Sequence, residues 1–231
     1  MFKKRSTFFL LVVLLTGCGN LNSHSSIIDW VDFIKWDGKD YAGIDSGVLA
    51  DPSFIGEKVG MVKFKVDGNV TDSTYKTRNG DAAFHEKGTA IYKLKGQEDL
   101  LAVKNSRSIN GYEVYFTTEN ARYHWRYKDM PAAKVKKIEI YQAYTADGTK
   151  LLNTITNKSK VIRFLQLLEK GKTAPNFQPD TKKGDPLYYE MTFYTGEPVA
   201  YKYSLLYDGK TYFWYPDDTA VLSQEIKDFI P

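Results

Sequence analysis

The densest group of residues that could do acid–base chemistry lies in the segment RNGDAAFHEKGT, residues 78–89. It contains Asp81, His85 and Glu86, and an aspartate that orients a histidine is a common arrangement for a general base. In an extended strand residues 81 and 85 share a face, whereas residue 86 points to the other side. Asp81 and His85 are therefore the candidate catalytic pair. The segment also fits a structural role, in which Asn79-Gly80 forms a turn and Asp81 accepts hydrogen bonds from turn amides.

A second group of acidic residues lies near the start of the chain. Asp29 and Asp32 stand close to Trp30 and Trp36, and paired carboxylates are the groups that cleave glycosidic bonds. The other acidic residues are scattered over turns and polar strand positions. We assign no site residue from this group alone.

The sequence contains no motif of a metal site, a serine nucleophile, a phosphate-binding loop or a disulfide. His24, His85 and His124 are far apart, and none belongs to the closely spaced pairs that zinc sites use. The sequence contains neither a Gly-x-Ser-x-Gly elbow nor a glycine-rich phosphate loop. Cys18 is the only cysteine, so no disulfide can form within one chain. We predict no metal site and no cofactor.

Aromatic residues crowd the last third of the chain. Alternate residues of a strand face opposite sides, so both faces of the last predicted sheet carry aromatic rings, while helices can cover only one. An uncovered face would present tyrosines to a ligand, a glycan or a protein. On this interpretation Tyr201, Tyr203 and Trp214 are the candidate binding residues. The alternative is that this face packs against the N-terminal part of the chain.

The candidate residues are positioned by two parts of the chain that are both rich in predicted β-strands. In residues 27–130, Asp37-Gly38 is a two-residue hairpin signal, residues 56–66 alternate in strand fashion, and no helical period occurs. We expect a small all-β domain here, a partly open barrel or a sandwich.

The second part, residues 131–231, is predicted to be an α+β domain. Asn157 can cap a helix whose apolar residues recur at helical spacing up to Gly171. A last short helix is expected to follow, capped by Asp217, Asp218 or Thr219. The order of the predicted strands and helices along this part of the chain predicts an antiparallel sheet with two helices on one face. The fold class is therefore mainly β with an α+β second part.

The first 17 residues have the layout of a secretory signal peptide. Lys3, Lys4 and Arg5 precede an apolar run, Phe8–Leu15, which small residues follow. The run is much shorter than the roughly 18–20 residues that span a bilayer. We therefore expect a removable signal.

The residues Leu15-Thr16-Gly17-Cys18 resemble the lipobox of bacterial lipoproteins. The resemblance implies that the signal is cut before Cys18 and that this residue carries a diacylglyceryl group and further fatty acyl chains such as palmitate. Two or more acyl chains give stable attachment to a membrane. Residues 18–26 would then be a lipidated tether, with membrane lipid as the partner of Cys18. The folded part would lie at the extracytoplasmic face of the cell membrane.

The charge of the remaining chain is close to neutral. Three of the 32 basic residues lie in the first 17 positions, which leaves 29 basic residues against 28 acidic ones. Nucleic-acid binding needs clustered positive charge, so we expect no nucleic-acid partner.

Two longer segments carry a second resemblance. GMVKFKVDGNV with YKTRNGDAAFHEKGTAIYKLKG, and VKKIEIYQAY with LLNTIT, are similar to segments of uncharacterised surface lipoproteins of Gram-positive bacteria. The resemblance implies no activity and no catalytic residue. We expect a non-enzymatic binding or regulatory module that meets an envelope protein or a wall polymer. The alternative is a cell-envelope enzyme that uses a site near Asp81 and His85.

Overall fold

The computed structural model describes residues 28–119, 122–146 and 148–231. The expected signal peptide, Cys18 and the tether lie outside these residues. The described chain consists mainly of antiparallel strands in two sheets, with few helices, so the prediction of a mainly β, α+β fold is confirmed.

Sheet A is formed by strands from the N-terminal half of the chain. Its strand order is β4 (Ile55–Met61), β7 (Ala90–Leu94), β8 (Gln97–Lys104), β9 (Tyr112–Thr117), β2 (Lys39–Gly43), β1 (Phe33–Trp36), β6 (Asp81–Ala82) and β5 (Phe64–Lys65). The pairs are antiparallel except β5 with β6. The β1–β2 hairpin turns at Asp37-Gly38, where φ is 48° and 77°. Two successive residues at positive φ are what a type I′ turn requires, so this predicted hairpin is confirmed.

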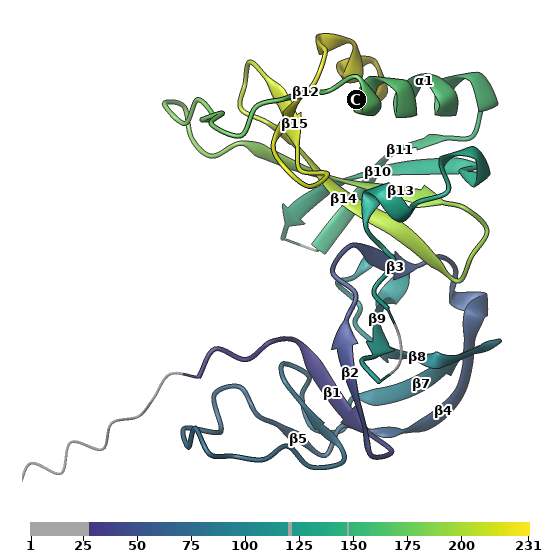
Figure 1. Cartoon of the computed structure of the whole chain (residues 1–231), viewed down its shortest axis with the longest axis vertical. Coiled ribbons are helices and arrows are strands. Elements are labelled where there is room, and N and C mark those ends of the chain that lie inside the picture. The colour runs from purple at the N-terminus through teal and green to yellow at the C-terminus, as the bar shows by residue number, and fades with distance from the viewer. Residues whose placement is uncertain (1–27, 120–121, 147) are drawn as a thin grey trace, which may run out of the picture.

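Sheet A is strongly curved, and its two faces pack against different partners (Figure 1). Alternate residues of β8 divide between two cores: Leu101 and Val103 face the concave side, whereas Leu100 and Ala102 face sheet B. The concave-side cluster, which we call the inner core, contains Ile34, Tyr41, Val62, Ala82, Ile91, Leu101, Val103 and Tyr115.

Sheet B contains the C-terminal strands. Its order is β11 (Gly148–Ile155), β10 (Lys137–Thr145), β13 (Leu187–Tyr194), β14 (Val199–Tyr207), β15 (Tyr212–Trp214), β16 (Ala220–Val221) and β12 (Lys172–Thr173), and β3 (Gly47–Leu49) also pairs with β14. Thus one short strand from the N-terminal half of the chain completes the C-terminal sheet.

Two helices cover one face of sheet B. Helix α1 (Lys158–Glu169) begins at the predicted cap, because the Asn157 side chain accepts a hydrogen bond from the Lys160 amide. The second helix differs from the prediction. It is the 3-10 helix η5 (Gln224–Phe229), it begins after Ser223, and the residues expected at its start form β16 instead. Within the described residues, no helix is long and apolar enough to cross a membrane.

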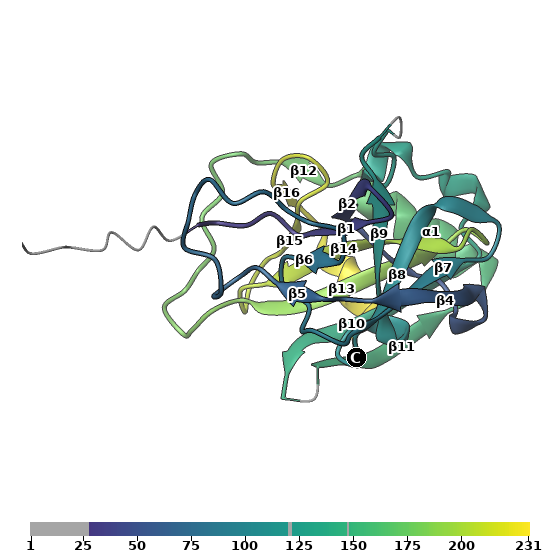
Figure 2. The same ribbon diagram turned by 90° about the horizontal axis from the view of Figure 1, so that it is seen from below.

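A single core continues from sheet A to sheet B. Leu100 and Phe116 of sheet A belong to the same buried cluster as Phe164 of α1 and Phe193 of β13. The connection through Trp125 lies in this cluster as well. Figure 2, seen from below, shows the strands of sheet A in front of those of sheet B. The two sheets are therefore packed layers.

Candidate functional site

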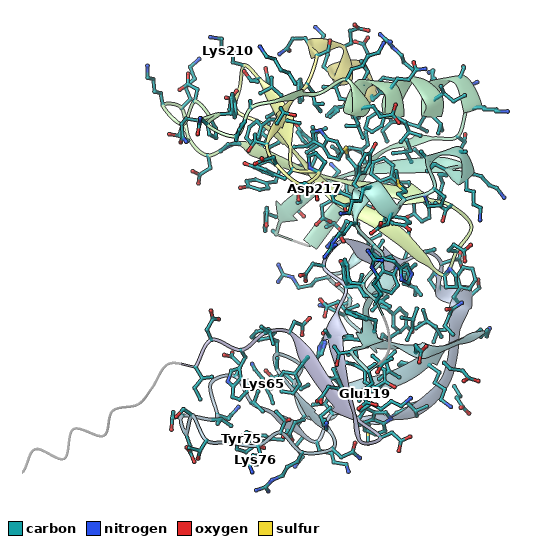
Figure 3. All side chains as sticks on the ribbon, in the orientation of Figure 1. Lys65, Tyr75, Lys76, Glu119, Lys210 and Asp217 are labelled. Atoms are coloured by element: carbon teal, nitrogen blue, oxygen red, sulfur yellow. The ribbon has the colours of Figure 1, made fainter. Side chains whose placement is uncertain are left out.

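The predicted pair Asp81 and His85 is buried, but its two members have separate partners. Asp81 accepts hydrogen bonds from the Tyr75 hydroxyl and from the Arg78 amide, each at 2.7 Å. The hydrogen bond from the Arg78 amide is the turn contact that we expect if this segment has a structural role. Tyr75 lies at the end of sheet A that points away from sheet B (Figure 3). Asp81 therefore anchors the turn that precedes β6 and does not orient His85.

Glu86, the third member of the predicted group, also lies apart. Its carboxylate forms an ion pair with Lys65 at 2.8 Å, and its side chain is exposed. The group predicted from local spacing is thus divided among three separate sets of contacts.

His85 belongs instead to a hydrogen-bonded chain that reaches across sheet A. Its Nε2 lies 2.6 Å from the Tyr115 hydroxyl, which donates to the Asp32 carboxylate at 3.0 Å. Glu113 lies 3.3 Å from the same histidine nitrogen. The Tyr115 hydroxyl donates its only proton to Asp32. The hydrogen bond between His85 and Tyr115 therefore requires that His85 Nε2–H donates to the tyrosine oxygen. We call these four residues the polar chain.

Burial dominates the electrostatics of the polar chain. It raises the pKa of Asp32 from 3.8 to about 6, although the Tyr115 hydrogen bond acts to lower it and the charges of Glu113 and Asp45 raise it further. Burial also lowers the pKa of His85, against the opposing effect of Glu113, and raises the pKa of Tyr115. A desolvated site disfavours every charged form. The neutral histidine and the neutral tyrosine are thus the stable species.

The backbone leaves room for the Asp32 carboxylate. A Cβ built on Gly43 would lie 2.4 Å from Asp32 Oδ2, so a side chain at this position would displace the carboxylate. Asp32 and Glu113 also line a cavity of about 210 Å³ that lies between the sheets, which Glu190 and Lys202 of sheet B line as well. Perturbed titratable groups beside a cavity mark a candidate site.

The candidate binding residues Tyr201, Tyr203 and Trp214 are on the covered face of sheet B. Tyr201 is 6% exposed and Trp214 is 1% exposed, and Tyr203 is half-buried. The Tyr203 hydroxyl donates to the Trp125 carbonyl at 2.9 Å, and Tyr127 packs on Trp214 at 4.7 Å between ring centroids. The expectation of an exposed aromatic face at these positions is wrong. The alternative, packing against the preceding part of the chain, holds.

Aromatic rings do remain exposed on the opposite face of sheet B. Tyr188 is 37% exposed and Tyr215 is 47% exposed. Tyr188 aligns with Leu206, which aligns with Phe213, so the three residues share a face, but Leu206 and Phe213 are buried. Strand alternation in the sequence predicted two aromatic faces, but the face that α1 covers could not be chosen from the pattern.

A pocket of about 1030 Å³ opens on the concave face of sheet A. Its apolar lining includes Trp36, Tyr41, Val59 and Leu101, together with Ile55 and Leu94 at the boundary with the core that is shared with sheet B. Its volume is at the upper end of the range typical of small-molecule sites, and barrel mouths are a usual position for such sites. We call it the concave pocket.

The Trp36 side chain extends from β1 to the backbone of β4 beside the concave pocket. A Cβ built on Gly60 of β4 would lie 2.0 Å from Cη2 and 2.4 Å from Cζ2 of this tryptophan. The edge of the indole therefore rests against the glycine backbone, where no side chain fits. The sequence contains Trp36 next to the hairpin turn and Gly60 within an alternating strand, but nothing local shows that the two meet.

The structure gives no candidate metal centre. Among the described residues, no group of three or more histidine, cysteine or acidic side chains could hold a metal ion. Comparison with protein-family models, with curated proteins and with solved structures gives no match. The concave pocket and the polar chain are therefore the two candidate sites of the described residues.

Proposed function

We propose that the chain is a membrane-anchored extracytoplasmic lipoprotein whose folded part is a non-enzymatic binding module. The anchor rests on the lipobox-like residues that end at Cys18. The single observation that supports the binding role is the concave pocket, which is lined by aromatic, apolar and charged side chains of sheet A.

The curved sheet A suits a binding role because one of its faces packs in the core and the other lines the pocket. The convex side packs into the core that is shared with sheet B. The concave side is filled by the inner core at one end and opens into the pocket at the other. A ligand in the pocket would meet side chains already fixed by strand pairing, and such preorganisation reduces the entropy lost on binding.

A cell-envelope enzyme near Asp81 and His85 is the alternative function. It has less support, because Asp81 is committed to Tyr75 and Arg78 and is not hydrogen-bonded to His85. The polar chain around His85 has perturbed protonation states, but its histidine nitrogen is engaged by Tyr115.

The binding role is tested by photo-crosslinking in living cells. A diazirine amino acid placed at Glu57, an exposed residue that lines the concave pocket, should form a discrete adduct of higher mass. The same residue placed at Lys150, an exposed position on β11 outside the pocket, is the matched control. Equal labelling at both positions, or none at either, would remove the support for a ligand site in the pocket.

A further inference from the structure

Trp36 forms the floor of the concave pocket. It packs against the inner core, lines the pocket and touches Gly60 with its edge. The indole therefore lies between the inner core and the pocket. A flat aromatic face of this kind accepts another flat, largely apolar surface, such as the C–H face of a sugar ring.

The rim of the pocket carries balanced charge. It contains three lysines and three acids, namely Lys39, Lys93, Lys95, Asp37, Glu57 and Glu98. Lys93 lies 3.1 Å from Glu57, and Lys95 donates to the Ser53 carbonyl at 2.8 Å. Electrostatic attraction of a highly charged polymer needs an excess of one sign. The rim therefore favours a ligand without net charge.

Planar polar groups surround the floor. The amides of Asn79 and Gln97 line the pocket together with the carboxylates, and Asn79 Oδ1 is fixed by the Gly38 amide at 3.4 Å. A carboxylate or amide group has two polar atoms that can engage neighbouring hydroxyls. These groups match a ligand with hydroxyls around its edge.

The adjacent sheet edge is poorly suited to an added peptide strand. Strand β4 is the end strand of sheet A, but its register with β7 is shifted twice, between Ile55 and Lys58 and between Lys58 and Gly60. Bulges and an edge lysine are devices that discourage strand addition, whereas peptide recognition by an edge needs a regular row of backbone groups. A peptide is thus the less favoured ligand.

We propose that the concave pocket binds a neutral oligosaccharide, with one sugar ring stacked on Trp36 and its hydroxyls bonded to the rim carboxylates and amides. This proposal rests on the binding function proposed above and specifies its ligand class.

The test is calorimetric titration of the full chain with cellotetraose and with chitotetraose. We expect saturable binding to the native protein that weakens at least tenfold, or about 1.4 kcal/mol, in Trp36→Leu. Leucine keeps an apolar contact with the inner core but removes the flat face. Trp30→Ala is the matched control, because Trp30 packs on Phe33 and does not line the pocket. Glu98→Ala, at an exposed rim position, should weaken binding without affecting the fold.

Three results would overturn the proposal. Equal affinity of the native protein and Trp36→Leu would place the sugar elsewhere. Absence of binding to either oligosaccharide, in a protein that still forms the crosslinked adduct at position 57, would keep the binding function but reject the glycan. Capture of a short peptide that is lost in Trp36→Leu would replace the glycan with a peptide ligand.

Discussion

The polar chain predicts a specific dependence of stability on pH. Asp32 is half-buried, and burial raises its pKa from 3.8 to about 6. The folded protein therefore binds the Asp32 proton more tightly than the unfolded chain does. This contribution to stability is fully present below about pH 4 and is lost as the pH rises through about 6.

The size of the effect follows from the pKa change. A change of about two units corresponds to at most about 3 kcal/mol, and partial exposure of the carboxylate to water reduces it to about 1–2 kcal/mol. Asp32→Asn removes the titration but keeps an oxygen that can accept the Tyr115 hydrogen bond. The free energy of unfolding of the variant, minus that of the native protein, should therefore rise by about 1–2 kcal/mol between pH 4 and pH 8.

Urea denaturation at one-unit steps from pH 4 to pH 8 measures this difference directly. Subtraction of the two profiles cancels groups that titrate equally in both proteins. The charges of Glu113 and Asp45 act on Asp32, and His85 belongs to the same polar chain. Asp29→Asn, at an exposed position, is the matched control. A flat difference, or a difference that falls with rising pH, would refute the assignment of a raised pKa to Asp32.

Three further predictions concern other parts of the chain. Gly60→Ala should lower the free energy of unfolding by about 1–3 kcal/mol, because the new Cβ overlaps the edge of Trp36; unchanged stability in urea would show that the indole does not rest on β4. Glu139→Ala should cost about 2–3 kcal/mol, because Glu139 is buried and accepts from the hydroxyls of Tyr141 and Tyr194, and a loss below 0.5 kcal/mol, on the order of a surface substitution, would contradict this. Cys18→Ser should release the protein from the membrane fraction and remove the lipid mass, and unaltered fractionation would reject the anchor.

Local features of this fold could be predicted from the sequence because their causes are local. Asp37-Gly38 supplies two residues that tolerate positive φ, and the observed register pairs Trp36 with Lys39 across that turn. Asn157 caps α1 within its own turn. The apolar period of the helix and the alternation of the strands likewise depend on neighbours close in sequence.

The candidate sites could not be predicted because long-range contacts assemble them. Asp32 and Tyr115 are 83 residues apart, whereas the predicted pair Asp81 and His85 is close in sequence but divided between different partners. The short strand β3 shows the same limit, since its pairing with β14 depends on how the two sheets pack.

The face that each aromatic residue occupies also depends on tertiary packing. Alternation places Tyr203 and Trp214 on one side of sheet B, but only the position of α1 and of the segment around Trp125 shows that this side is covered.

Nuclear magnetic resonance of the indole N–H groups shows whether an oligosaccharide occupies the concave pocket beside Trp36. The chain has four tryptophans, so a ¹⁵N-labelled sample gives one indole signal for each, and single substitutions assign them. On titration with chitotetraose, we expect the Trp36 signal to shift saturably while the signals of the buried Trp125 and Trp214 stay in place. A Trp36 signal that does not move at any oligosaccharide concentration, or moves no more than the others, would contradict a glycan site on the concave face of sheet A.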